Sequence, residues 1–150
     1  MSHATLQSPI GPILVSANDS ALTGVRIGQS DMAEDANPLL REALRQLGAW
    51  FDGKLDIFDL PLEPLTSPRG EVHRAAIAAI PAGGTASYGE IARRISSSPR
   101  AVGQACRRNP LPIIVPCHRV LGAGGAIGHY TGGEGVKTKI WLLEHERRKG

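Results

Sequence analysis

The amino-acid sequence predicts a small α/β half followed by a mainly helical half that contains a helix-turn-helix. Two short apolar segments and one amphipathic helical segment come first, and a proline-rich stretch then interrupts the chain. Beyond that stretch, short helical segments separated by tight turns lie in a basic region, which is the outline of a helix-turn-helix. We therefore expect two domains, at residues 1–66 and 67–150.

Two strands and one helix are expected at the start of the chain. The apolar segments 13–15 and 22–27 flank turn-forming polar residues and predict a pair of strands. Asn37 followed by Pro38 predicts the start of a helix, because asparagine caps the first turn and proline fits its first position. One face of this helix carries the apolar residues Leu40, Leu44, Leu47 and Phe51.

The middle of the chain holds a further strand, predicted at residues 57–60, and then the proline-rich linker. A short helix after the linker is expected to end before Pro81. Its apolar face is formed by Val72, Ala76, Ala79 and Ile80.

The helix-turn-helix is predicted from two helices that a run of serines separates. The first helix covers residues 88–95, and the second runs from about Arg100 to Arg107 after the cap-and-proline pair Ser98-Pro99. The second helix is unusually smooth, because it carries Ala101, Gly103 and Ala105. A smooth helix can press its backbone into a narrow groove of DNA or pack tightly inside the protein, and the residues alone leave both open.

The last helix is expected to begin near Glu134, with Val136, Ile140 and Leu143 on its apolar face. Glu146 lies at the edge of that face. Judged from its position alone it is a solvated charge, as Glu144 is with Arg148 four residues further on.

Charge is unevenly divided along the chain. Residues 1–66 carry four basic and nine acidic residues, whereas residues 67–150 carry thirteen basic and five acidic ones, so the second half is suited to a polyanion. The chain has no apolar run of membrane-spanning length and no export signal at its start, and we expect a protein that is neither membrane-bound nor exported. Its two cysteines do not have zinc-site spacing and are expected to be free thiols.

Cys117 is the residue around which chemistry is expected. The apolar residues 113–115 predict a buried strand that ends at Pro116, which places the thiol at the rim of the core. A buried cysteine is usually structural, but His118 and Arg119 follow directly, and cationic neighbours favour a reactive thiolate. The local residues leave a core residue and a nucleophile equally open.

Six ordered motifs make the chain similar to the O6-alkylguanine-DNA alkyltransferases. Pro-Cys-His-Arg at residues 116–119 matches the active-site signature of that family. The other matches are Asn109-Pro110-Leu111-Pro112, Ser87-Tyr88-Gly89-Glu90-Ile91-Ala92, Arg100-Ala101-Val102-Gly103, Gly128-His129-Tyr130-Thr131-Gly132-Gly133 and Trp141-Leu142-Leu143-Glu144-His145-Glu146. The match is clear over about residues 81–146 and looser over 9–62. It implies a ribonuclease-H-like first domain and a winged helix-turn-helix-like second domain.

The resemblance implies a catalytic role for several residues. Cys117 would take the alkyl group, with its proton passing through water to His118, which Glu146 orients. Tyr88 would give a proton to the departing base, and Asn109 would tie the loops of the site together. Because the product is a thioether, which water cannot cleave, each molecule would react once.

The resemblance also implies how the substrate is held. The partner is double-stranded DNA carrying O6-alkylguanine, entered through the minor groove, and O4-alkylthymine stays open as a second substrate. Arg100 would fill the gap that the extruded base leaves. Other DNA contacts would come from Ala101, Gly103, Ala105, Arg107 and Arg119, and the substrate pocket from Val120, Gly128, Tyr130 and Thr131. We expect a monomer without cofactor or metal, located in the cytoplasm, or in the nucleus of a eukaryote.

The sequence departs from the family pattern at residues 70–77, where two aromatic residues are missing, at Thr131, where some members have serine, and at Cys106. Three other functions fit part of the sequence. A thiol protease or acyltransferase leaves Arg100 and the smooth helix unexplained, and a helix-turn-helix repressor would carry more base-reading side chains. A non-catalytic sensor of alkylated bases, an alkyltransferase-like protein, has tryptophan where this chain has Cys117.

Overall fold

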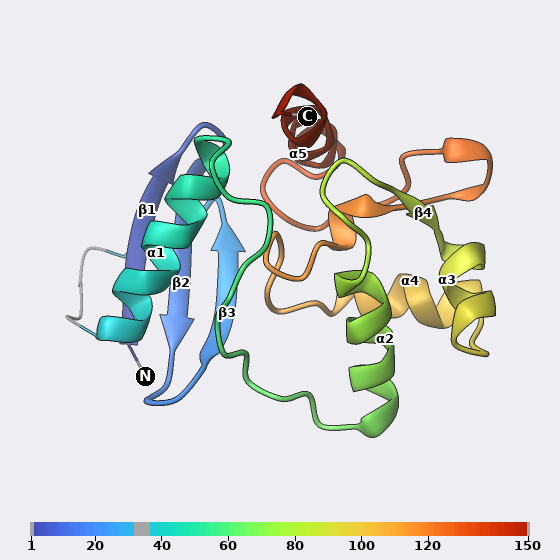
Figure 1. Ribbon diagram of the computed structural model, residues 1–150, viewed down its shortest axis with the longest axis horizontal. Coiled ribbons are helices and arrows are strands. Elements are labelled where there is room, and N and C mark those ends of the chain that lie inside the picture. The colour runs from blue at the N-terminus through green and yellow to red at the C-terminus, as the bar shows by residue number, and fades with distance from the viewer. Residues whose placement is uncertain (1, 32–36, 150) are drawn as a thin grey trace.

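A computed structural model describes residues 2–31 and 37–149 of the chain. In its first part, β1 (Ser2–Ser8), β2 (Gly11–Ala17) and β3 (Leu22–Ile27) form an antiparallel sheet in that order, and α1 (Pro38–Phe51) packs against it (Figure 1). Asn37 Oδ1 accepts hydrogen bonds from the backbone nitrogens of Leu39 and Leu40, which confirms the predicted helix start. The two predicted strands are confirmed as β2 and β3, and β1 precedes them.

The prediction of a strand at residues 57–60 is wrong. This segment forms no strand in the structure, and Ile57 is 82% exposed. The side chain of Gln46 takes the place of a neighbouring strand, because its amide donates to Asp59 O and its carbonyl accepts from Asp59 N. Just beyond this segment, Leu62 pairs with Leu22 of β3 in an isolated bridge.

Among the described residues, the second part contains four α-helices and a short pair of strands. They are α2 (Pro68–Ala78), β4 (Ala86–Ser87), α3 (Tyr88–Arg94), α4 (Pro99–Arg107), β5 (Val120–Leu121) and α5 (Val136–Lys149). Serines cap α2, α3 and α4, at positions 67, 87 and 98. The helices α3 and α4 form the helix-turn-helix, and β4 and β5 pair in parallel beside it. The predicted fold class, a small sheet with a helix followed by a mainly helical domain, is confirmed.

Two helices bury a face that matches the predicted one only in part. In α2, His73 and Ile77 are buried while Val72 is 41% exposed, and Ile80, just beyond the helix, is buried as predicted. In α5, Val136 and Ile140 are exposed, Leu143 is buried as predicted, and Thr138, Lys139, Leu142 and Glu146 are buried with it. Glu146 turns inward because α5 packs on the short 3₁₀ helix η1 (Cys117–Arg119), whose His118 and Arg119 pair with this carboxylate. Lys139 turns inward because its ammonium binds backbone carbonyls.

Residues 113–115, expected as a strand, form a tight turn. Ile113 has φ of +74°, and Val115 N donates to Leu111 O across the turn. A strand would need extended backbone at Ile113, so the apolar run is buried here without being a strand.

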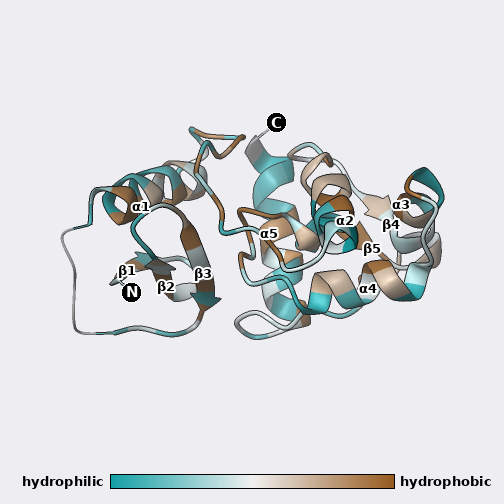
Figure 2. Ribbon diagram, turned by 90° about the horizontal axis from the view of Figure 1, so that it is seen from below, coloured by the Kyte–Doolittle hydropathy of each residue, from teal (hydrophilic) through white to brown (hydrophobic). Residues whose placement is uncertain are grey.

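The two parts lie side by side, and α5 lies at their junction in both views (Figures 1 and 2). No helix within residues 2–31 and 37–149 is long and apolar enough to cross a membrane.

Candidate active site

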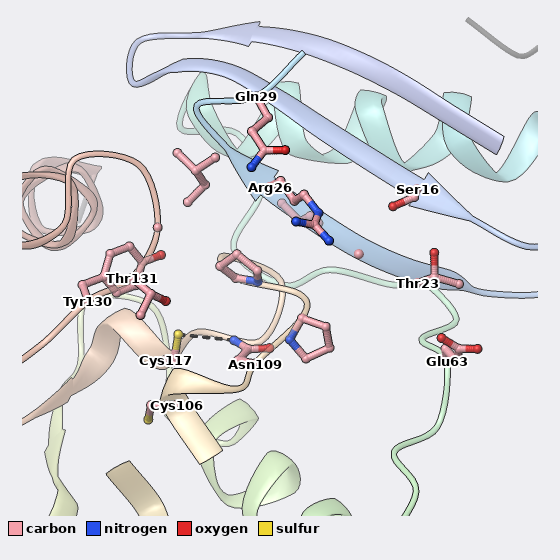
Figure 3. Close-up of a pocket in the computed structure, with 16 residues that line it drawn as sticks. Ser16, Thr23, Arg26, Gln29, Glu63, Cys106, Asn109, Cys117, Tyr130 and Thr131 are labelled. Carbon is pink, nitrogen blue, oxygen red and sulfur yellow. Dashed lines mark hydrogen bonds between the residues drawn. The ribbon is translucent and has the colours of Figure 1, made fainter. Parts of the chain in front are cut away.

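Cys117 is the first residue of η1 and is only 6% exposed. The Asn109 amide donates to Cys117 Sγ at 3.3 Å (Figure 3). It also donates to Val115 O at 2.8 Å. The amide oxygen of Asn109 accepts from Leu111 N at 3.0 Å. A single side chain therefore fixes both ends of the 109–117 segment and the sulfur atom, which is the placement expected for Asn109.

The turn that Asn109 closes is strained. Ile113 is β-branched and buried, yet it adopts a left-handed backbone conformation that such residues rarely take. Strain of this kind costs about 1–3 kcal/mol and persists only where surrounding contacts enforce it. The Asn109 hydrogen bonds supply that enforcement, and the turn delivers Cys117 to its position.

Behind the thiol, His118 and Arg119 converge on one carboxylate. Glu146 Oε1 lies 3.0 Å from His118 Nε2 and 3.0 Å from Arg119 Nε, and a second pair of contacts joins Oε2 to Nε and Nη2 of Arg119. Arg119 Nη1 also donates to Ile80 O at 2.6 Å. All three side chains are buried, so Glu146 is not the solvated charge that its position alone suggested.

The charge state of this cluster follows from its contacts. Burial by itself would raise the pKa of Glu146, but hydrogen bonds from His118 and Arg119 lower it to about 2, so the carboxylate is ionised. Burial lowers the pKa of His118 below 6.5, despite the hydrogen bond to Glu146. A neutral imidazole must then donate through Nε2 to the carboxylate, which leaves Nδ1 as a hydrogen-bond acceptor. This Nδ1 is buried and has no partner among the described residues.

Burial raises the pKa of the Cys117 thiol, while the Asn109 hydrogen bond and the charge of Lys139 act in the opposite direction. The prediction that His118 and Arg119, as cations, favour the thiolate form of Cys117 is wrong. His118 is neutral, and Arg119 is committed to Glu146. At rest the cysteine is a thiol, and its proton has to be removed during attack.

Lys139 is a site residue that the sequence did not single out. It is fully buried, and its ammonium donates to Val120 O at 2.7 Å and to His129 O at 3.4 Å. Burial lowers its pKa, and the nearby Cys106 and Cys117 thiols act against that shift. The sequence does contain a signal, because Lys139 precedes Glu146 by seven residues and so shares a helix face with it.

Tyr88, the first residue of α3, borders the site from the side of the helix-turn-helix. Burial is the main cause that raises the pKa of its phenol, so the hydroxyl stays protonated at neutral pH. A Cβ atom at Gly128 would lie 3.2 Å from Tyr88 Oη and 3.5 Å from Lys139 Nζ. Because Gly128 has no side chain, both polar groups can approach the loop, and its φ of +75° also favours glycine at this position.

A cavity of about 520 Å³ opens beside Cys117 between α4 and the 128–131 loop, and we name it the DNA-side cavity because it adjoins the helix-turn-helix. It is lined by Tyr88, Pro99, Arg100, Gly103, Cys106, Arg107, Cys117, His129, Tyr130 and Thr131. Val120 does not line it, since its side chain is fully buried and its carbonyl binds Lys139. Tyr130 is buried and Thr131 is exposed.

The structure separates the residues assigned to DNA contact. Arg100 and Arg107 are exposed on α4, and Gly103 faces the DNA-side cavity with them. Ala101 and Ala105 line a different cavity, between α2 and α4. The DNA contact assigned to Arg119 needs correction, because its guanidinium is buried against Glu146 and Ile80 and is not presented to a DNA surface.

The structure also shows where two residues that depart from the family pattern lie. His73, in the altered 70–77 segment, is buried and hydrogen-bonded to Arg69 O and Ser97 Oγ, both at 2.8 Å. Cys106 is partly buried in the DNA-side cavity, and burial raises its pKa to about 12. No cluster of three or more metal-ligating side chains occurs in the described part of the chain.

The class that follows from this fold and site is a cysteine-dependent transfer enzyme with a helix-turn-helix built into its catalytic domain. Two family models match the chain: the 6-O-methylguanine DNA methyltransferase ribonuclease-like domain over residues 1–64, and the DNA binding domain of the same enzyme over residues 70–148. The chain therefore belongs to the 6-O-methylguanine DNA methyltransferase family. The resemblance drawn from the motifs is confirmed, and so is the ribonuclease-like character of the first domain.

Individual relatives agree over nearly the whole chain. A methylated-DNA–protein-cysteine methyltransferase of Methanosarcina acetivorans is 40% identical and covers 96% of this chain and 98% of its own length. The protein of that name from Mycobacterium leprae is 37% identical, over 97% of this chain and 92% of its own. The crystal structure of Mycobacterium tuberculosis OGT in complex with DNA matches with a TM-score of 0.87 at 38% identity, over 100% of this chain and 95% of that one.

Proposed function

We propose that this protein repairs DNA by moving the alkyl group of O6-alkylguanine onto Cys117. The observation that carries the proposal is a buried thiol, held by Asn109, next to a hydrogen-bonded pair of His118 and Glu146. In this pair, His118 Nδ1 is left as a free acceptor for a proton. The names of the relatives and the DNA-bound structure of one of them support the same reaction.

The transfer is a displacement at the alkyl carbon. As the thiol proton passes through water to His118 Nδ1, the sulfur forms a bond to that carbon and the bond from carbon to guanine O6 breaks. The electron pair of the broken bond stays with the purine, which is neutralised by a proton from the Tyr88 hydroxyl. The imidazolium that forms at His118 is stabilised by the Glu146 carboxylate, which Arg119 holds in place.

Asn109 and Lys139 have supporting roles in this scheme. Both lower the pKa of Cys117 against the effect of burial, so negative charge that develops on sulfur is stabilised. Lys139 also holds the carbonyls of Val120 and His129, which fixes the strand and loop on either side of the base. The product is a thioether without an activated carbonyl, so the thiol is not regenerated and each molecule reacts once.

The helix-turn-helix brings the lesion to the thiol. A base stacked in a duplex must be extruded first, at a cost of a few kcal/mol that is smaller for a mispaired lesion. Arg100 is exposed at the start of α4 and beside the DNA-side cavity, where it can enter the gap in the stack. Gly103 would let the backbone of α4 approach a narrow minor groove, and the exposed Arg107 would bind a phosphate.

We place this activity where the DNA is, in the cytoplasm of a bacterium or archaeon or the nucleus of a eukaryote, and we propose that a monomer performs it without a cofactor. Each reacting group in the scheme comes from one chain. These are Cys117, His118, Glu146, Asn109 and Tyr88.

The test is to mix the protein with a duplex containing one O6-methylguanine and to find the methyl group by peptide mass spectrometry. We expect one methyl group per protein on the peptide that contains Cys117, and loss of transfer in Cys117→Ser. Cys106→Ser should keep full transfer, because the high pKa of Cys106 keeps it a neutral thiol. If the duplex is bound while Cys117 stays unmodified, the protein is a sensor of alkylated bases and the repair proposal is wrong.

A further inference from the structure

A cavity of about 710 Å³ borders the strained turn at residues 113–115, and no step of the proposed reaction uses it. One wall comes from residues 56–62, in the segment that runs from α1 past β3 toward α2 (Figure 1). The other walls are α2 with residues 79–82, and residues 113–116. We name it the linker cavity, because residues 56–62 lead into the proline-rich linker. Its volume is in the range of sites that bind small molecules.

The lining of the linker cavity is apolar apart from four charged side chains. The apolar members are Ile57, Phe58, Leu60, Leu62, Ala75, Ala78, Ala79, Ile80, Pro81, Ala82, Ile113, Ile114, Val115 and Pro116. Ile57 is 82% exposed, so part of this apolar surface faces water. Burying it against a hydrocarbon would be favourable, at about 25 cal/mol for each Å² removed from water.

Arg74 is the polar group of the lining that lacks a partner. Its side chain is only 11% exposed, and Nη1 donates to Glu63 O at 2.9 Å. Nη2 is buried and has no hydrogen-bond partner among the described residues. A buried donor without a partner is costly, so the guanidinium is suited to an acceptor that a ligand brings into the cavity.

The charges of the lining favour an anion as that acceptor. Asp56 is exposed and the Glu71 side chain is 45% exposed, so water screens both carboxylates. Glu71 Oε1 also accepts from Leu65 N at 2.6 Å and lies 3.8 Å from Arg74 Nη1, which is longer than a hydrogen bond. The two guanidinium groups, of Arg74 and Arg119, are instead largely buried.

We propose that the linker cavity binds a straight-chain carboxylic acid of about 8–12 carbons, with its carboxylate on Arg74 and its chain against the apolar lining. A hydrocarbon chain fits because it needs no hydrogen bonds. A peptide fits less well, since its backbone groups would lie against side chains that offer none. No covalent bond forms or breaks, and the site is separate from the alkyl transfer at Cys117.

The experiment titrates the full chain with decanoate in isothermal titration calorimetry, below the concentration at which decanoate forms micelles. We expect one decanoate per protein, bound at least about tenfold more tightly than 1-decanol, which has the same chain without the charge. Arg74→Met should weaken decanoate binding about tenfold to a hundredfold, and Ala75→Phe, which fills the cavity, should weaken the binding of both ligands. Arg94→Met and Ala123→Phe make the same changes at exposed positions outside the cavity, and each should leave both affinities within about twofold.

The outcomes decide between a built site and general adhesion of an amphiphile. If 1-decanol or decylammonium binds as tightly as decanoate, or if Arg74→Met keeps full affinity, recognition of a carboxylate by Arg74 is disproved. If several decanoates bind per chain and Ala75→Phe binds them equally well, the cavity is not the site. Far-UV circular dichroism checks that each variant is folded, and Ala75→Phe decides the matter if Arg74→Met is not.

Discussion

At the level of single residues, the central problem is how a buried thiol loses its proton. Burial favours the neutral form of Cys117, and the groups that oppose burial are Asn109 and Lys139. His118 can accept the proton because burial keeps it neutral and Glu146 fixes its tautomer. Activity therefore needs a protonated thiol and a neutral imidazole at the start of the reaction.

This requirement predicts a flat pH profile around neutrality. His118 has a pKa below 6.5, so imidazole protonation reduces the rate only at more acidic pH. Cys117 has a pKa above 9.0, and Tyr88 one above 10.0, so neither group deprotonates below pH 9. We expect the single-turnover rate on O6-methylguanine DNA to change less than about twofold between pH 6.5 and 8.5, with an acidic limb below it. A rate that keeps rising from pH 6.5 through pH 8.5 would show instead that a free thiolate is the attacking species.

A second prediction concerns Arg119. The sequence led us to expect a DNA contact from this residue, but its side chain is buried in the core. Removing one partner from a buried ion pair costs about 3–5 kcal/mol, and Arg119→Met should lower the free energy of unfolding by this amount in urea titrations. It should leave the salt dependence of duplex binding unchanged. Arg107→Met is the matched control on an exposed arginine: it should leave stability within about 0.5 kcal/mol and reduce the salt slope by about one. If Arg119→Met reduced the salt slope of duplex binding, Arg119 would be a DNA-contacting residue as first expected.

Local residues predicted the thiol and its immediate neighbours but not the cluster behind them. Glu146 is 28 residues from His118 in sequence, and nothing in its own helix indicates that it turns inward. The family resemblance supplied that pairing, while the competing bonds from Arg119 to Glu146 and Ile80 became visible only in three dimensions. Lys139 was missed for the same reason, since a lysine is placed on the surface unless its partners are known.

At the level of elements, α2 holds the turn between α3 and α4. His73 Nδ1 lies against the carbonyl of Arg69 and therefore donates, which leaves Nε2 to accept from the Ser97 hydroxyl. Arg69 Nη2 donates to the carbonyls of Ile95 and Ser96, and Ser96 has a φ of +54°. These bonds fix a strained turn, and with it the orientation of α4 against DNA.

We expect His73→Leu to weaken this connection without touching the thiol. Loss of the bond leaves the Ser97 hydroxyl unpaired, which costs about 1–3 kcal/mol of stability. Transfer from duplex DNA should slow severalfold more than transfer from free O6-benzylguanine, because only the duplex needs α4 in place. Val72→Ala, an exposed change on the same helix, serves as the control and should alter neither rate. Equal slowing with both substrates would mean that His73 acts on overall stability alone.

Helix starts were predictable because they depend on local chemistry, whereas buried faces were not. Asn37 and Ser98 each cap the helix that follows, as their sequence context indicated. The face that α5 buries depends on η1, a partner brought close by the 109–117 turn. Hydrophobic periodicity favoured Val136 and Ile140 for the buried face. Instead, Glu146 is buried because it pairs with η1, and Lys139 is buried because it binds the carbonyls of Val120 and His129.

At the level of the whole molecule, the two domains share the active site. Val25 N, at the edge of β3, donates to Pro110 O at 2.9 Å, and Pro110 directly follows Asn109. Gly133 lies so close to β3 that a Cβ atom there would be 2.9 Å from Ile27. At the end of α1, the Trp50 ring lies edge-on 6.3 Å from the His118 ring, and His145 Nε2 bonds Trp50 O at 2.9 Å.

These contacts predict that the protein unfolds as one unit and that Trp50 influences the chemistry. In calorimetry, the ratio of calorimetric to van't Hoff enthalpy should be about one, and two separate transitions would contradict the coupling.

Trp50→Leu should lower the free energy of unfolding by about 2–4 kcal/mol, because a ring that is 2% exposed is lost. Ile57→Ala, at an 82% exposed position in the same domain, is the control and should change it by less than about 0.5 kcal/mol.

The sharper consequence of Trp50→Leu concerns the pKa of His118. Burial is the main cause that lowers this pKa, and Trp50 is part of what buries the imidazole. Admitting water in the variant should raise the pKa toward 6.5, so the acidic limb of the rate profile moves to higher pH while the rate above pH 7.5 changes little. A variant that only loosens the fold would lower the rate at every pH without moving the limb. A displaced limb would therefore show that a side chain of the first domain tunes the base that removes the Cys117 proton.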